Sequence, residues 1–315
     1  MEAGSTAATS GRAEAPSLRA ARRRWGEDVI KGLLMLAALI SVLTTTGIVL
    51  SLLGETIAFL GDVGVADFLF GTEWSPAIQP ASFGVLPLVA GTLLISLVAM
   101  MVATPLGLGA AIYLAEYARP GVRKTIKPIL ELLAGVPTIV FGYFALTFFT
   151  PEILRGLFGL DVAIFNGLAG GIIIGFLIIP TVASISEDSM SAVPQSLREG
   201  AFGLGAGKLQ VTLRVIFPAA LSGIVASLVL AMSRAVGETM VVLLASGLQP
   251  QWGANLGQAM ETMTAYIATT AKGDIATGSI AFETVFAVGM TLFVITLILN
   301  IFSIRFVRKY RQIYE

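Results

Sequence analysis

Six long apolar stretches are the strongest constraint on how this 315-residue chain can fold. A helix of about 20 apolar residues is needed to cross a hydrocarbon core of roughly 30 Å. The sequence predicts such helices at residues 29–53, 83–114, 128–149, 165–185, 218–248 and 279–304. The chain is therefore predicted to be an all-α membrane protein with six transmembrane helices.

The composition restricts the chemistry that such a chain can perform. It contains no Cys and no His, and only 13% of its residues are charged. Thiol nucleophiles, Fe–S clusters and imidazole-dependent catalytic or metal sites are therefore excluded. The formal net charge of zero provides no general attraction for nucleic acid. We expect no catalytic residues, no resident metal or cofactor and no nucleic-acid partner, and we expect lipid to be the surrounding medium.

Basic residues are distributed unevenly among the segments that connect the predicted spans. Seventeen of the 20 Lys and Arg residues lie in the N-terminal segment, the loops after the second and fourth spans, and the C-terminal tail. Because short loops rich in Lys and Arg stay in the cytoplasm, both termini are predicted to be cytoplasmic. Residues 1–28 are expected to be a disordered tail and residues 306–315 a second tail. The first span is too long for a signal-peptide core, which favours an uncleaved helix.

Small residues and one proline distinguish the second and fourth spans. Glycines in these spans are expected to let helices pack closely in lipid. They are Gly91, Gly107, Gly109, Gly170, Gly171 and Gly175. Pro105 interrupts the second span and predicts a kink or break there, because proline removes a backbone donor.

The segment between the fourth and fifth spans, residues 187–217, predicts two short helices. Pro194 signals a helix start, and Gly203 and Gly205 signal its end. Gly207 and Lys208 look like the end of a phosphate-binding loop, but the first glycine and the final Ser or Thr of that motif are missing. Nucleotide binding by this chain is therefore not expected.

Topology does not explain one basic residue, Arg234. It lies 16 residues beyond Pro218, roughly 24 Å along a helix, and therefore inside the fifth span. Glu238 follows four residues later and is expected to share its helical face. The planar donors of an arginine match a tetrahedral oxyanion, and a nearby carboxylate would prevent an over-tight anion site. Two interpretations stay open: a substrate pathway, or a salt bridge that fixes helix packing.

The 187–217 segment resembles the EAA loop of binding-protein-dependent ABC importer permeases, the MetI-like family. That pattern reads Glu-Ala-Ala, three residues, Gly, nine residues and Ile-x-Leu-Pro. Its positions here are Glu199, Gly200, Ala201, Gly205, Val215, Phe217 and Pro218. The glycine, valine and phenylalanine at 200, 215 and 217 depart from it. The resemblance implies a coupling helix that docks on a separate ATPase. The alternative is an ordinary amphipathic connector.

A second run narrows the resemblance. Residues 234–240, Arg-Ala-Val-Gly-Glu-Thr-Met, are similar to phosphate-specific ABC permeases of the PstC type. Residues 83–87, 111–117 and 131–138 are also similar, and the likeness covers roughly residues 30–310. It implies that residues 29–305 form a permease domain in the cell inner membrane and that Arg234 and Glu238 line the substrate pathway.

The resemblance also implies partners and a mechanism. They are a PstA-like permease subunit, two PstB-like ATPase subunits that bind the ATP, and an external PstS-like phosphate-binding protein, which together import phosphate by alternating access. In this interpretation the chain is a transport subunit and not an enzyme. The alternatives are a permease for another oxyanion such as molybdate or sulfate, a polyamine permease, a secondary transporter, and a membrane enzyme. The arginine–glutamate pair disfavours a polycation, and the absence of a clear inverted repeat disfavours a secondary transporter.

Overall fold

The computed structural model describes residues 25–273, 276 and 278–310. The N-terminal tail up to residue 24 and the C-terminal tail from residue 311, both predicted from the sequence, lie outside the described residues. The chain divides into two compact units, Met1–Val49 and Leu50–Glu315. The described part of the first unit is the beginning of a long helix, α1 (Trp25–Val63). The following paragraphs concern the second unit.

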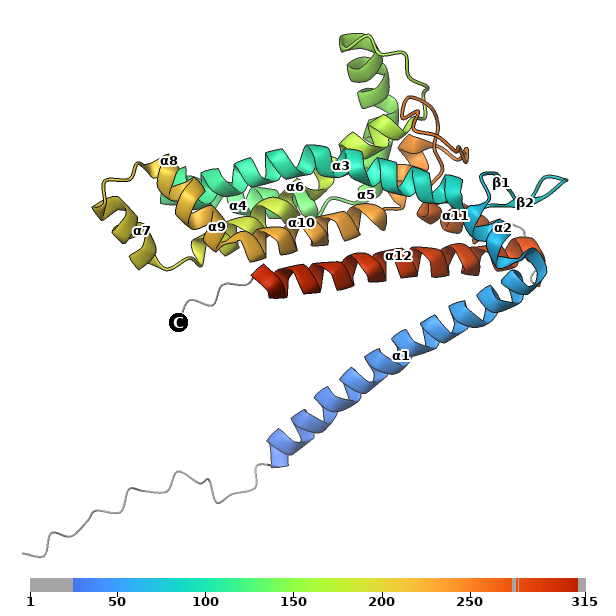
Figure 1. Cartoon of the computed structure of the whole chain (residues 1–315), viewed down its shortest axis with the longest axis horizontal. Helices are drawn as coiled ribbons and strands as arrows, with labels where there is room; N and C mark the ends of the chain where they lie inside the picture. Colours follow the sequence, from blue (N-terminus) through green and yellow to red (C-terminus); the bar gives the residue numbers. More distant parts are fainter. Residues whose placement is uncertain (1–24, 274–275, 277, 311–315) are drawn as a thin grey trace, which may run out of the picture. The chain divides into compact units, whose positions relative to one another are not determined.

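Helices dominate the second unit, and one short antiparallel hairpin accompanies them (Figure 1). In chain order the elements are α2 (Val65–Phe70), β1 (Trp74–Ser75), β2 (Ser82–Phe83), α3 (Leu86–Ile112), η1 (Tyr113–Tyr117), α4 (Pro120–Ala134), α5 (Thr138–Phe144), η2 (Ala145–Leu157) and α6 (Gly167–Ser191). They continue with α7 (Gln195–Gly203), α8 (Lys208–Val211), η3 (Thr212–Ile216), α9 (Phe217–Ala219), α10 (Leu221–Val236), η4 (Val242–Ser246), α11 (Met263–Thr270) and α12 (Ile280–Tyr310). The η elements are π-helical turns.

The candidate membrane spans coincide with the six apolar stretches of the sequence. Within the described ranges, four helices are long and apolar enough to cross a membrane: Gly26–Val63, Leu86–Tyr117, Gly167–Ser191 and Ile280–Arg308. Two bent pairs of helices bring the number to as many as six. The first pair bends by 84° between Pro120–Ala134 and Thr138–Leu157, and the second bends by 71° between Lys208–Ala219 and Leu221–Val236.

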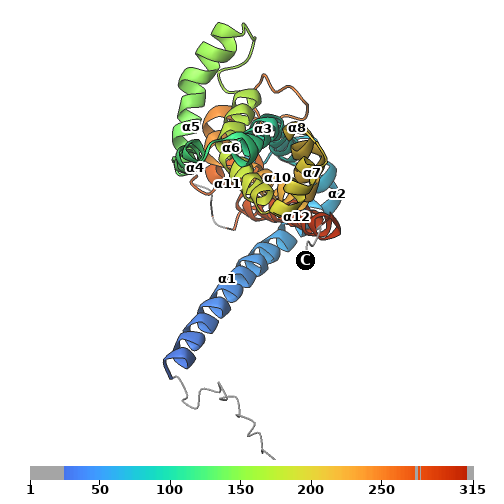
Figure 2. The same cartoon turned by 90° about the vertical axis from the view of Figure 1, so that its left-hand side faces the viewer.

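The core of the second unit lies between α3, α6 and α10, which run side by side (Figures 1 and 2). Glycines bring α3 and α6 very close together. A Cβ added to Gly171 would lie 2.7 Å from Cβ of Val98, and one added to Gly107 would lie 2.7 Å from Cβ of Val182. These distances confirm the predicted role of small residues at those positions. Gly109 is different, because a Cβ there would meet no atom within 4 Å.

The predicted break at Pro105 is wrong. Helix α3 continues through this residue from Leu86 to Ile112. A proline removes one backbone hydrogen bond, but α3 keeps its packing against α6, including the fully buried Ala99 and Ala103 in the turns that precede the proline. Proline inside a membrane helix is tolerated when such packing and local adjustments compensate for the lost donor.

Aromatic side chains hold together the segments that precede α3. Phe68 contacts Phe59 on one side and Trp74 on the other, both edge to face. Trp74 also contacts Tyr266 of α11 edge to face, with ring centres 5.0 Å apart. Edge-to-face pairs each add roughly 0.5–1.5 kcal/mol beyond their buried area. This cluster ties α11 to the hairpin and so positions the chain that follows α10.

Candidate functional site

Arg234 lies near the end of α10, against α6. Its Nη1 donates a hydrogen bond to Oγ1 of Thr181 on α6, with 3.2 Å between the atoms, and its side chain is half-buried. The bend before Leu221 shortens the straight run of helix that leads to Arg234, yet Arg234 lies 13 positions beyond Leu221 in α10, about 20 Å along the axis. A cation in the last turn of a helix also interacts favourably with the helix dipole.

The prediction that Glu238 shares a helical face with Arg234 is wrong. Helix α10 ends at Val236, and Gly237 caps it. Beyond the cap, the Glu238 carboxylate turns to its own chain: Oε1 accepts hydrogen bonds from the backbone N–H of Met240 at 3.0 Å and of Val241 at 3.3 Å. None of the ion pairs between described residues joins Glu238 to Arg234. The glycine was a visible signal for this helix end.

The break after α10 is closed by the first turn of α11, which begins at Met263. Thr264 donates a hydrogen bond to the backbone carbonyl of Glu238 at 2.7 Å, and Thr92 of α3 accepts one from the backbone N–H of Met263 at 3.0 Å. Such contacts satisfy backbone groups that an interrupted helix leaves free, which is required in a low-dielectric setting. The two threonines escaped the sequence analysis because no local pattern marks them.

Glu261 is a buried carboxylate that the sequence analysis also missed. It lies between α10 and α12, outside the candidate spans, and only 6% of it is exposed. Its backbone carbonyl packs against Gly91, where an added Cβ would come within 2.3 Å of the oxygen. Burial raises the pKa of Glu261 to about 7, because desolvation penalises the charged carboxylate.

Glu261→Gln should therefore stabilise the protein in a pH-dependent way. The carboxyl group of Glu261 has a pKa of about 7 in the folded chain and 4.5 in the unfolded chain. The free energy of unfolding of the parent protein therefore falls as the pH rises from 4.5 to about 7. At pH 8 the variant should gain up to about 3 kcal/mol, since one pKa unit corresponds to about 1.4 kcal/mol. Heat unfolding followed by tryptophan fluorescence at pH 5 and 8 measures this. The exposed control Glu152→Gln should show no such difference, and equal gains at both pH values would contradict the assignment.

The 187–217 segment folds as the sequence predicted, into a short helix, a turn and a second helix. Helix α7 follows Pro194 and ends at Gly203, and Gly205 adopts the left-handed backbone conformation with a φ of 81°. Only glycine adopts this conformation without strain. Leu204 in this turn is 91% exposed. The EAA-type positions Glu199, Gly200, Gly205 and Pro218 are also exposed, and Ala201 is half-buried.

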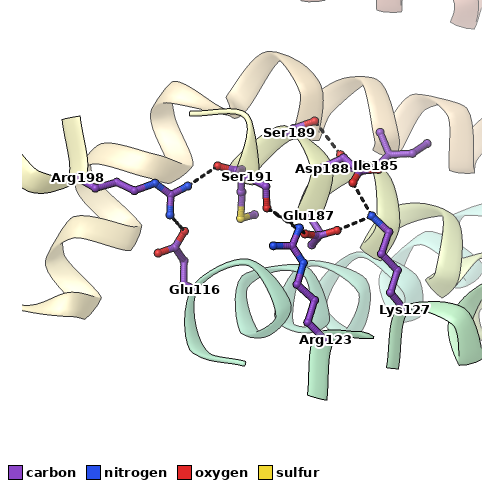
Figure 3. A network of polar contacts seen from close by, with 10 residues as sticks. Glu116, Arg123, Lys127, Ile185, Glu187, Asp188, Ser189, Ser191 and Arg198 are labelled. Carbon is purple, nitrogen blue, oxygen red and sulfur yellow. Dashed lines mark hydrogen bonds and ion pairs between the residues drawn. The ribbon is translucent and has the colours of Figure 1, made fainter. Parts of the chain in front are cut away.

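Arg198, next to Glu199, connects α7 to two other elements. Its Nη1 donates to Oε1 of Glu116 in η1 at 2.5 Å, and its Nη2 donates to the backbone carbonyl of Met190 at the end of α6 at 2.7 Å (Figure 3). The Arg198 and Glu116 side chains are 12% and 7% exposed, so this ion pair is largely removed from solvent. Removing one partner from such a pair is strongly destabilising, because the other charge is left buried and unpaired.

A second buried carboxylate, Glu187 of α6, receives two cations from α4. Arg123 pairs with Oε1, and the Lys127 ammonium pairs with Oε2 at 2.8 Å and with Asp188 at 2.5 Å (Figure 3). Glu187 is fully buried, and Ser191 also donates to it at 2.9 Å. The network thus fastens helix α4 to α6.

Comparison with known proteins agrees with this arrangement. Residues 103–312 match the family described as binding-protein-dependent transport system inner membrane component. The chain belongs to this family. It is 32% identical over 281 residues to a Bacillus subtilis protein named probable ABC transporter permease protein YqgH, which covers 89% of this chain and 88% of that protein. It is also 32% identical over 283 residues to the phosphate transport system permease protein PstC of Mesorhizobium japonicum, covering 84% of each. PstC of Haemophilus influenzae is 30% identical over 309 residues, 91% of this chain and 95% of that protein.

Solved structures share the fold of this inner membrane component. An alginate ABC transporter superposes with a TM-score of 0.62 at 18% identity, covering 92% of this chain and 100% of that one. The inward-facing MetNI methionine ABC transporter gives 0.55 at 20% identity, covering 71% and 95%. The all-α ABC importer permease fold and the inner-membrane location predicted from the sequence are thereby confirmed. The relatives are named permeases, which agrees with a transport subunit and not an enzyme.

Proposed function

We propose that this chain is a permease subunit of an ATP-driven importer of inorganic phosphate. The observation that supports this most directly is the place of Arg234: a guanidinium in the last turn of α10, held by one hydroxyl of α6 and by no carboxylate among the described residues. Relatives that align with most of the chain are named phosphate transport system permease proteins, and these names favour phosphate over molybdate or sulfate.

The chemistry of Arg234 suits an oxyanion that must be bound and released. The guanidinium offers a planar set of donors, and one hydrogen bond to Thr181 leaves others for an anion. The Glu238 carboxylate accepts hydrogen bonds from backbone N–H groups and forms no ion pair with Arg234 among the described residues, so the guanidinium keeps donors for an anion in this conformation. In our proposal Arg234 and Glu238 both line the substrate pathway, with Glu238 holding the local backbone turn and limiting how tightly the anion binds.

The pathway forms, in this proposal, between this chain and a PstA-like permease subunit. Arg234 is only half-buried within the chain, which suits a residue that faces a second subunit. Two PstB-like ATPase subunits bind ATP and contact the exposed EAA-type positions around α7, and a PstS-like binding protein delivers phosphate from outside. In this proposal both termini and α7 lie in the cytoplasm, which the excess of Lys and Arg on that side predicts. Alternating access then follows from movement of α7 with the ATPase.

ATP hydrolysis by the reconstituted complex tests the proposal. The membrane complex of this chain, the PstA-like subunit and the PstB-like ATPase is placed in proteoliposomes, and the binding protein is added empty, with phosphate, with sulfate or with molybdate. We expect phosphate-loaded protein to stimulate hydrolysis several-fold and to drive labelled phosphate into the vesicles. Stimulation by sulfate or molybdate in place of phosphate would identify a permease for another oxyanion. Phosphate uptake driven by an ion gradient without ATP would instead indicate a secondary transporter.

A further inference from the structure

Two cations contact the π-helical turn η1 at the end of α3. One lies before the turn that follows α7, and the other lies after it. Arg198 of α7 donates to Glu116 at 2.5 Å, and Nζ of Lys208, the first residue of α8, lies 4.8 Å from the ring centre of Tyr117. Gly205, with its left-handed backbone, lies between the two cations in the chain. Two consecutive residues of η1, Glu116 and Tyr117, are therefore contacted by the segment from α7 to the start of α8.

Burial distinguishes the Arg198 contacts from an ordinary surface ion pair. Exposed pairs add little stability, but the Arg198 and Glu116 side chains are 12% and 7% exposed. Arg198 is the one ion-pair partner that Glu116 has within the described part of the chain. The same guanidinium donates to the Met190 carbonyl, which joins α7 to the end of α6. Helix α7 has no fully buried residue of its own; Leu197 and Ala201 pack partly buried against the cluster around Met190, and the polar link of Arg198 adds a directional attachment.

We propose that Arg198 is a positioning residue of the transport cycle, which passes a displacement of α7 to α3 through Glu116 and to α6 through the Met190 carbonyl. This inference rests on the proposed function, because it takes α7 as the element that the ATPase moves. Helices α3 and α6 interlock at their glycines, and close-packed interiors transmit displacement with little loss. Helix α6 bears Thr181, which contacts Arg234, so the contacts run without interruption from α7 to the pathway residue.

Coupling between α7 and the pathway is tested with a single introduced cysteine whose labelling reports on the state of the pathway. The sequence contains no Cys, so Ser233→Cys, beside Arg234, places one thiol in this chain. The assembled complex is labelled with a maleimide, once without nucleotide and once trapped with ATP and vanadate. The quantity measured is the ratio of the two labelling rates on this chain. The probe is the nucleotide alone, so the readout does not depend on which solute is transported.

In the Ser233→Cys parent we expect the labelling rate to change on trapping. Arg198→Gln should reduce this change about fivefold or more, the lower end of typical coupling factors. Arg198→Glu should have the same effect, and combining it with Glu116→Arg should recover at least half of the response. Arg305→Gln is the matched control, because Arg305 is exposed on α12 and has no ion-pair partner among the residues that the structure describes. This control should respond like the parent.

Assembly is monitored by co-purification of the ATPase with each variant. A purely structural role would lower the amount of complex and leave the ratio unchanged in what assembles, and this result would overturn the proposal. So would an Arg198→Gln complex that responds like the parent. Where Arg198→Gln does not assemble, Arg198→Lys keeps the charge but replaces the two guanidinium nitrogens that reach Glu116 and the Met190 carbonyl by a single nitrogen. We expect a reduced ratio for this variant, and an unchanged ratio again overturns the proposal. Failure of phosphate to be transported would contradict the proposed function and leave this readout intact.

Discussion

Arg234→Gln should lower phosphate uptake by about 10- to 100-fold in proteoliposomes that contain the complete transporter, because hydrogen bonds to charged groups contribute roughly 1.5–3 kcal/mol each. Glutamine keeps a polar side chain that can still contact Thr181 but loses the positive charge and the planar fork of donors. Membrane insertion of the variant should be unaffected, since removing a charge from a membrane-spanning helix lowers the free-energy cost of inserting that helix. The measurement is the initial rate of labelled phosphate uptake, normalised to assembled complex.

Two further variants separate a pathway role from a packing role. Arg234→Lys keeps the charge without the fork and should give intermediate uptake. Arg305→Gln removes an exposed arginine near the end of α12 and should transport like the parent. Normal uptake by Arg234→Gln would exclude Arg234 from the pathway and leave only the interpretation as a residue that fixes helix packing.

Gly107→Ala should destabilise the protein by about 1–3 kcal/mol, the usual cost of inserting a methyl group into a packed interface. The new Cβ would lie 2.7 Å from both Cβ and Cγ1 of Val182, atoms near the backbone of α6 that have little freedom to move. The helices would have to separate along the interface that contains most of the core. The midpoint of heat unfolding of the purified protein in detergent measures the loss.

The neighbouring Gly109 supplies the matched control on the same helix. A Cβ at this position meets no atom within 4 Å, so Gly109→Ala should be neutral or slightly stabilising, because alanine is the better helix former by up to about 1 kcal/mol. Equal destabilisation by the two substitutions would show that α3 needs flexible backbone at this turn, and would contradict an explanation based on contact with α6.

Features that depend on local composition could be predicted from the sequence. The six apolar stretches, the close-packed glycines at 107, 171 and 175, and the helix–turn–helix around Gly205 all follow from residue type and spacing. Bends were harder to predict. Pro105 suggested a break that packing against α6 overrides, whereas Gly237 ends α10 and separates Arg234 from Glu238. A single proline or glycine has different consequences depending on what its helix packs against, and a single sequence does not specify this.

Contacts between distant segments could not be predicted. Glu116 and Arg198 are 82 residues apart, and Lys127 and Glu187 are 60 residues apart. In the sequence each cation counts simply as part of a basic loop, and each acid as an ordinary polar residue at a helix end. Their partnership depends on how α3, α4, α6 and α7 are placed in space, which is determined by core packing. The same holds for Glu261, which is buried by residues of α3 that lie far from it in the chain.

The hydrogen bond between Thr181 and Arg234 also bears on how the chain is made. Thr181 precedes Arg234 by 53 residues, so the ribosome completes α6 before it begins α10. An arginine that enters the bilayer alone costs at least about 2.5 kcal/mol. Because synthesis runs from α6 to α10, a polar partner is already present when the charged helix is released from the translocon. The order of elements along the chain therefore lets α10, with its charged Arg234, be inserted after the helix that supplies a hydrogen-bond partner for that charge.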